Sequence, residues 1–324
     1  MEILLKRGAR LWRVLAGEDT RVEHFLRRRY RLARCGMERE IVGEDYILFW
    51  SRQGSDRIGV YLKGGCHLHS IFSCKPWIHR GLRGTCCIFN DGDAADSRSD
   101  VLLQTLDGIP QDRLNPVTEK LRLRADYFRP SLFEKTFSVP GMRGTEVFTK
   151  TVTFISVGPD VVRTAYRHRR YGFLVDPGGW WLSQPMDRVL GNLESANWFR
   201  ENFESVGRLT VDAFAANYAK IIGLLKKNIA APVIVFSVPI VEPGKLIHNY
   251  GFVREPQAKR NREFYIALAE LSRKLDFPIV DVDRVLKKAG IGRQLDFAHF
   301  TPEQHEVLAR EAFSIARDIG VFRA

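Results

Sequence analysis

The sequence predicts an α/β fold, a three-layer α/β/α sandwich around a mostly parallel sheet of about five strands. Two observations predict it. Short runs of β-branched and apolar residues recur in the second half of the chain, and stretches with helical periodicity separate them. Such alternation is typical of a parallel sheet with helices on both faces. We expect this domain to span residues 57–324, after an N-terminal extension of residues 1–56.

The strands are predicted from runs that are short and rich in Val, Ile and Phe. In chain order they are residues 58–62, 152–157, 233–238 and 277–282. The run at 152–157 ends in Gly158-Pro159, and we expect a long loop after it that holds Asp176-Pro177-Gly178-Gly179. A further run at 46–50 forms either a hairpin with 58–62 or a separate strand of the sheet.

Helices are predicted where apolar residues recur every three or four positions, at residues 211–227, 262–275 and 302–319. The last helix begins with Thr301 as its N-cap and Pro302 as its first residue. The first 40 residues also have a helical pattern, with an apolar stripe among Arg and Lys. In residues 90–144 polar and apolar stretches alternate, and this pattern predicts no particular secondary structure. We expect these residues to form an insertion in the domain.

Composition sets the broad class of protein. Hydrophobic residues make up 45% of the chain and charged residues 27%, which excludes a disordered, collagen-like or coiled-coil protein. No apolar run is long enough to cross a bilayer, and Arg and Lys interrupt the apolar N-terminal stretch, unlike in a signal peptide. We therefore expect a cytoplasmic protein. The 5 cysteines lack the spacing of zinc ligands, so we expect reduced thiols and no metal site.

The formal net charge of +12 favours a polyanion, an anionic membrane or a phosphorylated small molecule as partner. Basic residues cluster at 27–31, 122–124 and 167–170, either on solvated faces or as phosphate sites. Because none of these clusters has interleaved aromatic residues or a helix-turn-helix pattern, we expect no nucleic-acid partner. The basic N-terminal helix either packs on its own domain or lies on the inner membrane surface. The sequence does not specify an oligomeric state.

A candidate nucleophile follows the strand at 58–62, in the segment Lys63-Gly64-Gly65-Cys66-His67-Leu68-His69. The two glycines allow a sharp turn and a close backbone approach to a substrate. A helix beginning there would lower the pKa of the Cys66 thiol and offer N–H groups to an oxyanion. The alternative is that Cys66 is only a small buried residue in a tight turn.

A second feature, Asp296-Phe297-Ala298-His299, lies in the loop before the last predicted helix. An Asp three residues before a His can bind one imidazole nitrogen and leave the other free as a base. The spacing predicts a catalytic dyad of Asp296 and His299, with a capping or core role as the alternative. Other candidates for substrate contact are His67, His69, His248 and Trp180, and the aromatic face of Trp180 would suit a sugar ring.

These features together resemble the SGNH/GDSL hydrolase-like superfamily, in which the nucleophile follows the first strand and an Asp-x-x-His precedes the last helix. The chain is most similar to the cysteine-bearing branches, the GSCFA-domain proteins and the capsular-polysaccharide enzymes with a Gly-Asn-Cys opening. Here the triplet is Gly64-Gly65-Cys66. The segment at 233–239, Asn261 with Phe264, and the closing run at 299–303 follow the same pattern.

The resemblance implies that Cys66 attacks an acyl carbon, that His299 acts as the base and that Asp296 orients His299. The family's third block is normally Gly-x-Asn-Asp, whereas this chain has Val157-Gly158-Pro159-Asp160. Because neither Pro159 nor Asp160 can donate as an asparagine does, the backbone N–H groups at Gly65 and Gly158 would hold the oxyanion.

We therefore expect an acyl-ester hydrolase or an O-acyltransferase that acts on a glycan or related hydroxylated substrate. A hydrolase would need no cofactor, whereas a transferase would take its acyl group from a donor such as acetyl-CoA, whose phosphates suit the basic clusters. The alternative is a non-catalytic binding or scaffold protein that associates with an anionic membrane or a partner through its basic N-terminal helix. The catalytic hypothesis requires Cys66, His299 and Asp296 to lie close together at one edge of the sheet.

Overall fold

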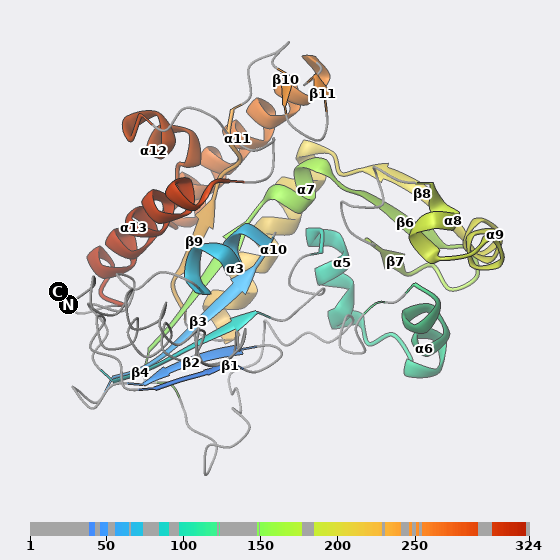
Figure 1. Ribbon diagram of the computed structural model, residues 1–324, viewed down its shortest axis with the longest axis horizontal. Helices are drawn as coiled ribbons and strands as arrows, with labels where there is room; N and C mark the ends of the chain where they lie inside the picture. The colour runs from blue at the N-terminus through green and yellow to red at the C-terminus, as the bar shows by residue number, and fades with distance from the viewer. Residues whose placement is uncertain are drawn as a thin grey trace, which may run out of the picture.

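The structure is a computed structural model of the 324-residue chain (Figure 1). It describes residues 39–42, 46–50, 56–64, 66–73, 84–90, 97–121, 123, 148, 150–176, 185–228, 231–240, 246–247, 251–252, 255–290 and 300–321. Within these residues the chain forms a large sheet covered by helices, with a smaller β-containing unit at one side (Figure 1).

The large sheet has seven strands among the described residues. In spatial order they are β1 (Arg39–Val42), β2 (Tyr46–Trp50), β4 (Gly84–Asn90), β3 (Asp56–Lys63), β5 (Lys150–Ser156), β9 (Val233–Phe236) and β12 (Ile279–Val280). From β4 to β12 neighbouring strands are parallel, whereas β2 and β1 join the β4 side as antiparallel strands. The predicted parallel sheet is confirmed, and the runs at 152–157, 233–238 and 277–282 share it.

The order of the parallel strands creates a switch point between β3 and β5. Along the chain the parallel strands are β3, β4, β5, β9 and β12, so their spatial order is second, first, third, fourth and fifth. From β3 the chain winds outward first to β4, and it then builds the other half of the sheet from β5. In open α/β sheets of this kind, ligands bind beyond the carboxyl ends of the strands at such a point.

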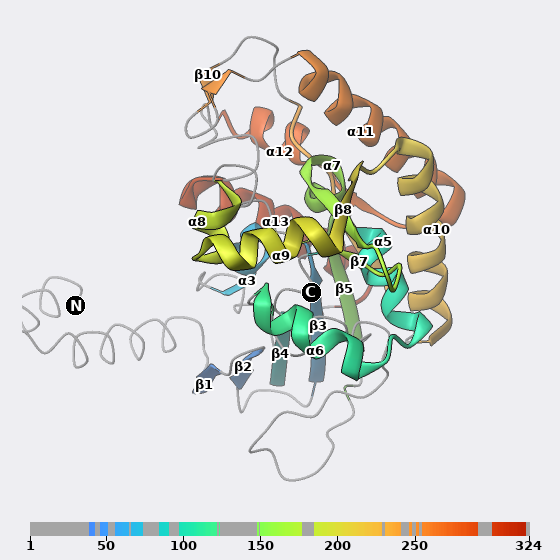
Figure 2. The ribbon, with the colours of Figure 1, turned by 90° about the vertical axis from the view of Figure 1, so that its right-hand side faces the viewer.

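Helices cover both faces of the sheet and complete the three layers, as Figure 2 shows from the side. One face is covered by α3 (Cys66–Ser73), α12 (Val282–Lys288) and α13 (Pro302–Asp318). The other is covered by α5 (Ser99–Gln104), α7 (Gly158–Val162), α10 (Val211–Asn228) and α11 (Glu255–Leu275). Alternate strand residues enter the two cores, with Val60 and Leu62 on the first face and Tyr61 on the second.

The predicted helices are confirmed as α10, α11 and α13. Thr301 is the N-cap of α13, and its hydroxyl accepts a hydrogen bond from the Gln304 N–H at 3.3 Å. The Gln304 side chain in turn accepts one from the Thr301 N–H at 2.8 Å, which completes a capping box. None of the described helices has the length and apolar character needed to span a bilayer.

The N-terminal region departs from the prediction where it is described. Residues 39–50, which the sequence assigns to the N-terminal extension, contribute β1 and β2 to the large sheet. The predicted alternative of a hairpin at 46–62 is wrong. Strand β2 pairs with β1 and β4, and β3 lies between β4 and β5. Long-range pairing with β4 decides this arrangement, and local pattern alone cannot reveal it. The predicted basic helix lies outside the described residues except at 39–40, which are in β1.

A second correction concerns the long loop expected after residue 157. This region instead contains α7 and a three-stranded antiparallel sheet of β6 (Thr164–His168), β7 (Leu174–Val175) and β8 (Phe203–Arg208). Helices α6 (Gln111–Lys120), α8 (Met186–Leu190) and α9 (Leu193–Asn202) pack around an aromatic and aliphatic core on this sheet. We call these strands and helices the side lobe. Its strands are short, and β6 carries an exposed Arg167 and ends in a histidine, so they give little hydrophobic signal.

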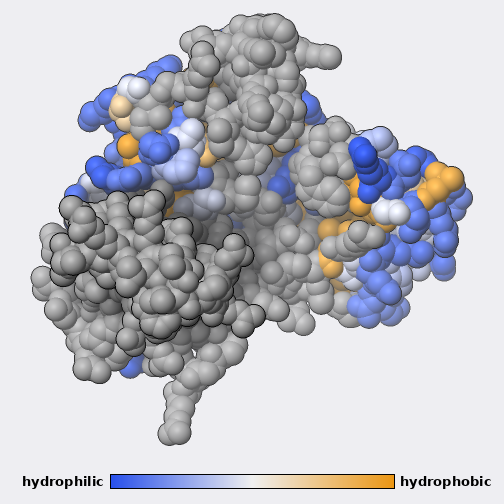
Figure 3. Space-filling view, in the orientation of Figure 1, coloured by the Kyte–Doolittle hydropathy of each residue, from blue (hydrophilic) through white to orange (hydrophobic). Residues whose placement is uncertain are grey.

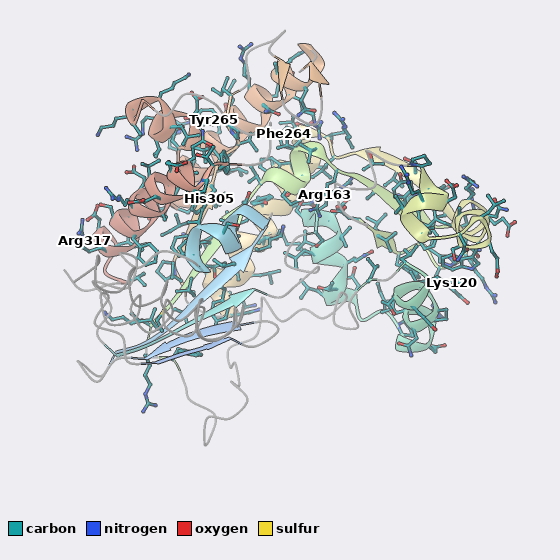
Figure 4. The ribbon with its side chains drawn as sticks, viewed as in Figure 1. Lys120, Arg163, Phe264, Tyr265, His305 and Arg317 are labelled. Carbon is teal, nitrogen blue, oxygen red and sulfur yellow. The ribbon has the colours of Figure 1, made fainter. Side chains whose placement is uncertain are left out.

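The side lobe projects from the large sheet in Figure 1, and Figure 3 shows a largely hydrophilic surface on it with hydrophobic surface at its outer end. Buried polar groups fix its base. Arg98, only 2% exposed, donates to the Gly207 carbonyl oxygen at 2.6 Å, and its own N–H donates to Asp176 Oδ2 at 2.9 Å. Arg163, labelled in Figure 4, forms an ion pair with Asp176 at 3.3 Å. The lobe is therefore joined to α5 and α7 by charge-assisted hydrogen bonds.

Candidate functional site

The turn after β3 has the form that the sequence predicts for a nucleophile. Strand β3 ends at Lys63, and α3 begins at Cys66. Cys66 is thus the first residue of a helix that starts at the carboxyl end of a parallel strand, beside the switch point. The first N–H groups of such a helix have no partner within it, and the positive end of its dipole stabilises an anion. The side chains of Cys66, His67 and His69 lie outside the described residues.

Gly64 makes this turn close to β5. Its φ is +138°, a conformation that L side chains rarely adopt. A Cβ added to Gly64 would lie 2.6 Å from the Ser156 Cβ and 2.9 Å from the Ser156 N and O atoms. Only glycine fits here, because any side chain would push the end of β3 away from the end of β5.

The segment after β5 provides the second side of the site. Val157 follows the strand, and Gly158 opens the five-residue helix α7, with Pro159 in its first turn. The Gly158 N–H, predicted as an oxyanion donor, donates to Ser156 Oγ at 3.3 Å. Ser156 is 2% exposed, so its hydroxyl is part of the wall between the two strand ends. An oxyanion would have to compete with this long hydrogen bond for the Gly158 N–H.

Asp160 is turned into the core and away from the surface of the strand ends. It is completely buried, its Oδ1 accepts from the Ser99 N–H at 2.7 Å, and its Oδ2 accepts from the Tyr218 hydroxyl at 3.0 Å. The pKa of the Asp160 carboxyl is raised above its ordinary value, because burial raises it more than the charge of Lys63 and the hydrogen bonds from Ser99 lower it. Burial, with the Asp160 charge and hydrogen bond, raises the pKa of Tyr218 well above its ordinary value. Asp160 therefore organises the loops behind the site.

The start of α13 lies at the same edge of the sheet as the start of α3. At its far end, the Gly320 carbonyl oxygen accepts a hydrogen bond from Lys150 Nζ at 3.5 Å, and Lys150 is the first residue of β5. A helix of 17 residues is about 25 Å long, about the length of a seven-residue strand. Since α13 ends at the amino edge of the sheet, its N-terminus reaches the carboxyl edge.

Packing joins α13 to α3 along this face. The Phe72 and Phe313 ring centroids are 5.5 Å apart, and Phe300, directly before the Thr301 cap, is 5% exposed in the same core as Leu68 and Ile71. His305, one turn into α13, is labelled beside α3 in Figure 4. Asp296 and His299 lie outside the described residues, so their convergence with Cys66 stays a prediction.

Comparisons with known proteins give no family assignment. No family model matches the chain, and no curated protein matches it. Among solved structures, the chain is similar to Axe2, an acetylxylan esterase from Geobacillus stearothermophilus, with 12% identity and a TM-score of 0.38 over 83% of this chain and 96% of that chain. It is also similar to a member of the lipolytic protein G-D-S-L family from Veillonella parvula DSM 2008. There the identity is 10% and the TM-score 0.36, over 80% of this chain and 97% of that chain.

The printed name of the second neighbour places that protein in the lipolytic G-D-S-L family, and that of the first describes an acetylxylan esterase. Neither similarity is strong enough to assign a role to any residue. The α/β/α fold rests on the strand order and the two helical layers described above.

The remaining predicted site residues are only partly placed. Gly65, Trp180 and His248 lie outside the described residues. Within the part of the chain that the structure describes, no group of His, Cys, Asp and Glu side chains could hold a metal ion.

One of the basic clusters, residues 167–170, is described and lies on the side lobe. Arg167 and Arg169 are half-exposed and both pair with Glu204, at 3.9 and 3.3 Å. His168 is buried among Tyr171, Phe173 and Phe203, and its Nδ1 accepts from the Arg170 N–H at 3.2 Å. This cluster is therefore a partly neutralised surface with a buried histidine, and its use as a phosphate site stays a prediction.

The sequence prediction omits Lys63, although this residue is among the most deeply buried of the site. Lys63 is 0% exposed and its Nζ donates to the Ser97 carbonyl oxygen at 2.8 Å. A signal was present in the strand pattern, because Lys63 lies two residues after Tyr61 and therefore on the same inward face.

Proposed function

We propose that the protein is an acyl-ester hydrolase or O-acyltransferase that uses Cys66 as its nucleophile. The observation that supports this proposal most is the position of Cys66 as the first residue of α3, two residues after Gly64, which lies against the end of β5. A thiol at a helix N-terminus ionises more readily than a free cysteine, and the thiolate is the reactive form. The same helix start supplies N–H groups for an oxyanion.

In the proposed reaction the Cys66 thiolate attacks the acyl carbon of an ester. The tetrahedral intermediate collapses to an acyl-thioester, and the alcohol leaves with a proton donated by His299. His299 then removes a proton from water or from an acceptor hydroxyl, which attacks the thioester and regenerates the thiolate. Asp296 holds the imidazole in the orientation that this exchange needs. The N–H groups at Gly65 and Gly158 bind the oxyanion in both steps.

Within this proposal, the substrate is an ester on a glycan or a related hydroxylated molecule. His67, His69, His248 and Trp180 are proposed to contact it, because all four follow strands or turns of the predicted site region. A hydrolase passes the acyl group to water. A transferase takes it from a donor such as acetyl-CoA and passes it to a sugar hydroxyl.

The test is turnover of an activated acetyl ester, such as p-nitrophenyl acetate, by the full chain. Cys66→Ala and His299→Ala should each abolish turnover, and Asp296→Asn should lower kcat by about 10²- to 10⁴-fold. Cys86→Ala is the matched control, because it removes a buried thiol from β4 on the same sheet and should retain activity.

A second measurement traps the intermediate. Incubation with the ester followed by acid quenching should leave an acetyl group on the peptide that contains Cys66, and none on that peptide from Cys66→Ala. Undiminished turnover in both Cys66→Ala and His299→Ala would overturn the mechanism.

A further inference from the structure

A lysine and an aspartate are completely buried behind the turn that leads to Cys66. Lys63 and Asp160 are both 0% exposed. The Lys63 ammonium donates to the Ser97 carbonyl oxygen at 2.8 Å, on the sheet face that α10 covers. A buried charge costs several kcal/mol unless an opposite charge and hydrogen bonds compensate for it. Retaining two such groups at one strand end therefore needs an explanation.

The two groups are held by one short segment of chain. Lys63 binds Ser97, and two residues later the Ser99 N–H donates to Asp160 Oδ1 at 2.7 Å. The Tyr218 hydroxyl donates to Asp160 Oδ2 at 3.0 Å, and the Asn217 side chain donates to Ser99 Oγ at 3.0 Å. The charge of Lys63 opposes the effect of burial on the pKa of Asp160, so the ammonium and the carboxylate act on each other.

The pair connects the two backbone segments that form the proposed oxyanion site. Lys63 directly precedes Gly64, where an added Cβ would lie 2.6 Å from the Ser156 Cβ. Asp160 follows Gly158 by two residues within α7. Arg260 also binds α7, donating to the Val161 carbonyl oxygen at 2.6 Å and to that of Asp160 at 3.1 Å. Hydrogen bonds from Ser99 and Arg260 thus hold α7, and β3 is linked to it through the segment 97–99 that binds both Lys63 and Asp160.

We propose that Lys63 and Asp160 are a positioning pair. They hold the backbone N–H groups near Cys66 and Gly158 in the relative positions that bind the oxyanion during acyl transfer. This inference rests on the proposed function and adds to it two residues that touch no substrate. It explains why charged groups remain at a place where apolar residues of similar size would fill the space.

The test uses three variants of the full chain: Lys63→Met, Asp160→Asn and the double variant. Each single change leaves one buried charge without its partner, whereas the double change removes both. In ester turnover we expect each single variant to lower kcat at least 10-fold with KM changed by less than about threefold, since the substrate does not touch the pair. The double variant should recover most of the lost kcat. Loss of packing alone would make the double variant at least as impaired as either single variant.

Lys150→Met is the matched control. Lys150 also donates from its ammonium to a backbone carbonyl oxygen, that of Gly320, but it lies at the opposite edge of the sheet and is only partly buried. Wild-type kcat in this variant would show that losing a lysine from the sheet is not in itself damaging.

Alkylation of Cys66 by iodoacetamide, followed by mass spectrometry of its peptide, separates this inference from the proposed function because it needs no turnover. The single variants should change the alkylation rate of Cys66 at least fivefold, and the double variant and Lys150→Met should react at nearly the wild-type rate. If ester turnover fails in the wild type, this rate still tests the pair.

If a single variant does not fold, folding of the double variant supports the pair, and its failure to fold contradicts it. Wild-type alkylation rates in folded single variants, or a folded double variant as impaired as the single variants, would overturn the inference.

Discussion

Gly64 lies so close to Ser156 that an added Cβ would lie 2.6 Å from the Ser156 Cβ. The contact joins the ends of β3 and β5, the two strands on either side of the switch point. It sets the direction in which the chain leaves β3 before α3 begins at Cys66. The backbone conformation at Gly64, with φ of +138°, and the absence of a side chain are both required for it.

Gly64→Ala should therefore reduce both stability and ester turnover. Backbone strain of about 1–3 kcal/mol adds to a similar cost of overpacking, so we expect the free energy of unfolding to fall by at least about 2 kcal/mol. Urea unfolding followed by circular dichroism measures this change, and turnover should fall at least 10-fold.

Gly223→Ala is the control for this substitution. Gly223 lies within α10, and a Cβ added there meets nothing within 4 Å. Alanine should raise the free energy of unfolding by about 0.5–1 kcal/mol, because it favours a helix more than glycine does. If Gly64→Ala is as stable as the wild type, the close approach to Ser156 does not constrain the turn.

Thr301→Ala tests the start of α13. The substitution removes the hydroxyl that accepts from the Gln304 N–H and opens the capping box, so we expect a loss of about 1 kcal/mol in the free energy of unfolding. Thr301→Ser keeps the hydroxyl, so its free energy of unfolding should fall by much less than that of Thr301→Ala. Chemical denaturation of the three proteins side by side gives the comparison, and equal losses in both variants would contradict a capping role.

The same cap shows why much of the fold could be predicted from sequence. Thr301-Pro302 marks a helix start through local chemistry alone, and the apolar runs at 152–157 and 233–238 are long enough to identify buried strands. The side lobe could not be predicted in this way. Its strands β6 and β7 have five and two residues, and their pairing is set by partners elsewhere in the chain.

Lys63 illustrates the corresponding limit at the candidate site. The alternation of β3 places Lys63 on the same inward face as Tyr61, but a lysine at the end of a strand is usually solvent-exposed, so this pattern does not identify its partners. Its partner Ser97 is 34 residues further along the chain, and Asp160 is further still. Only the folded arrangement brings these groups together. The turn at Gly64-Gly65-Cys66 was easier to predict, because the glycines and the preceding apolar run are contiguous.

His168 should make the stability of the protein sensitive to mild acid. Burial and the nearby charge of Arg170 lower the pKa of His168 below its ordinary value of 6.5. The folded state therefore binds this proton less readily than the unfolded state does. As the pH falls through 6.5 toward the folded-state pKa, the unfolded state gains protons first and the folded state loses stability.

His168→Gln removes this titration while keeping an oxygen that can accept from the Arg170 N–H. We expect the melting temperature of the wild type to fall by more than that of the variant when the pH is lowered from about 7.5 to about 5.5. Thermal melts of both proteins over this range measure the difference. A fall of the same size in both would show that other groups cause the acid sensitivity.

Cys86 should be inert toward thiol reagents in the folded protein. It is 2% exposed within β4, and burial raises the pKa of its thiol to about 12. At about pH 8 almost none of it is thiolate, the form that reacts. Iodoacetamide should leave the Cys86 peptide unmodified in buffer and modify it fully in urea, with fragment ions distinguishing Cys86 from Cys87. In the same digest Cys66 should be labelled in buffer, because a cysteine that begins a helix has a lowered thiol pKa. Labelling of Cys86 in buffer as rapid as that of Cys66 would contradict both the burial of β4 and the special reactivity assigned to Cys66.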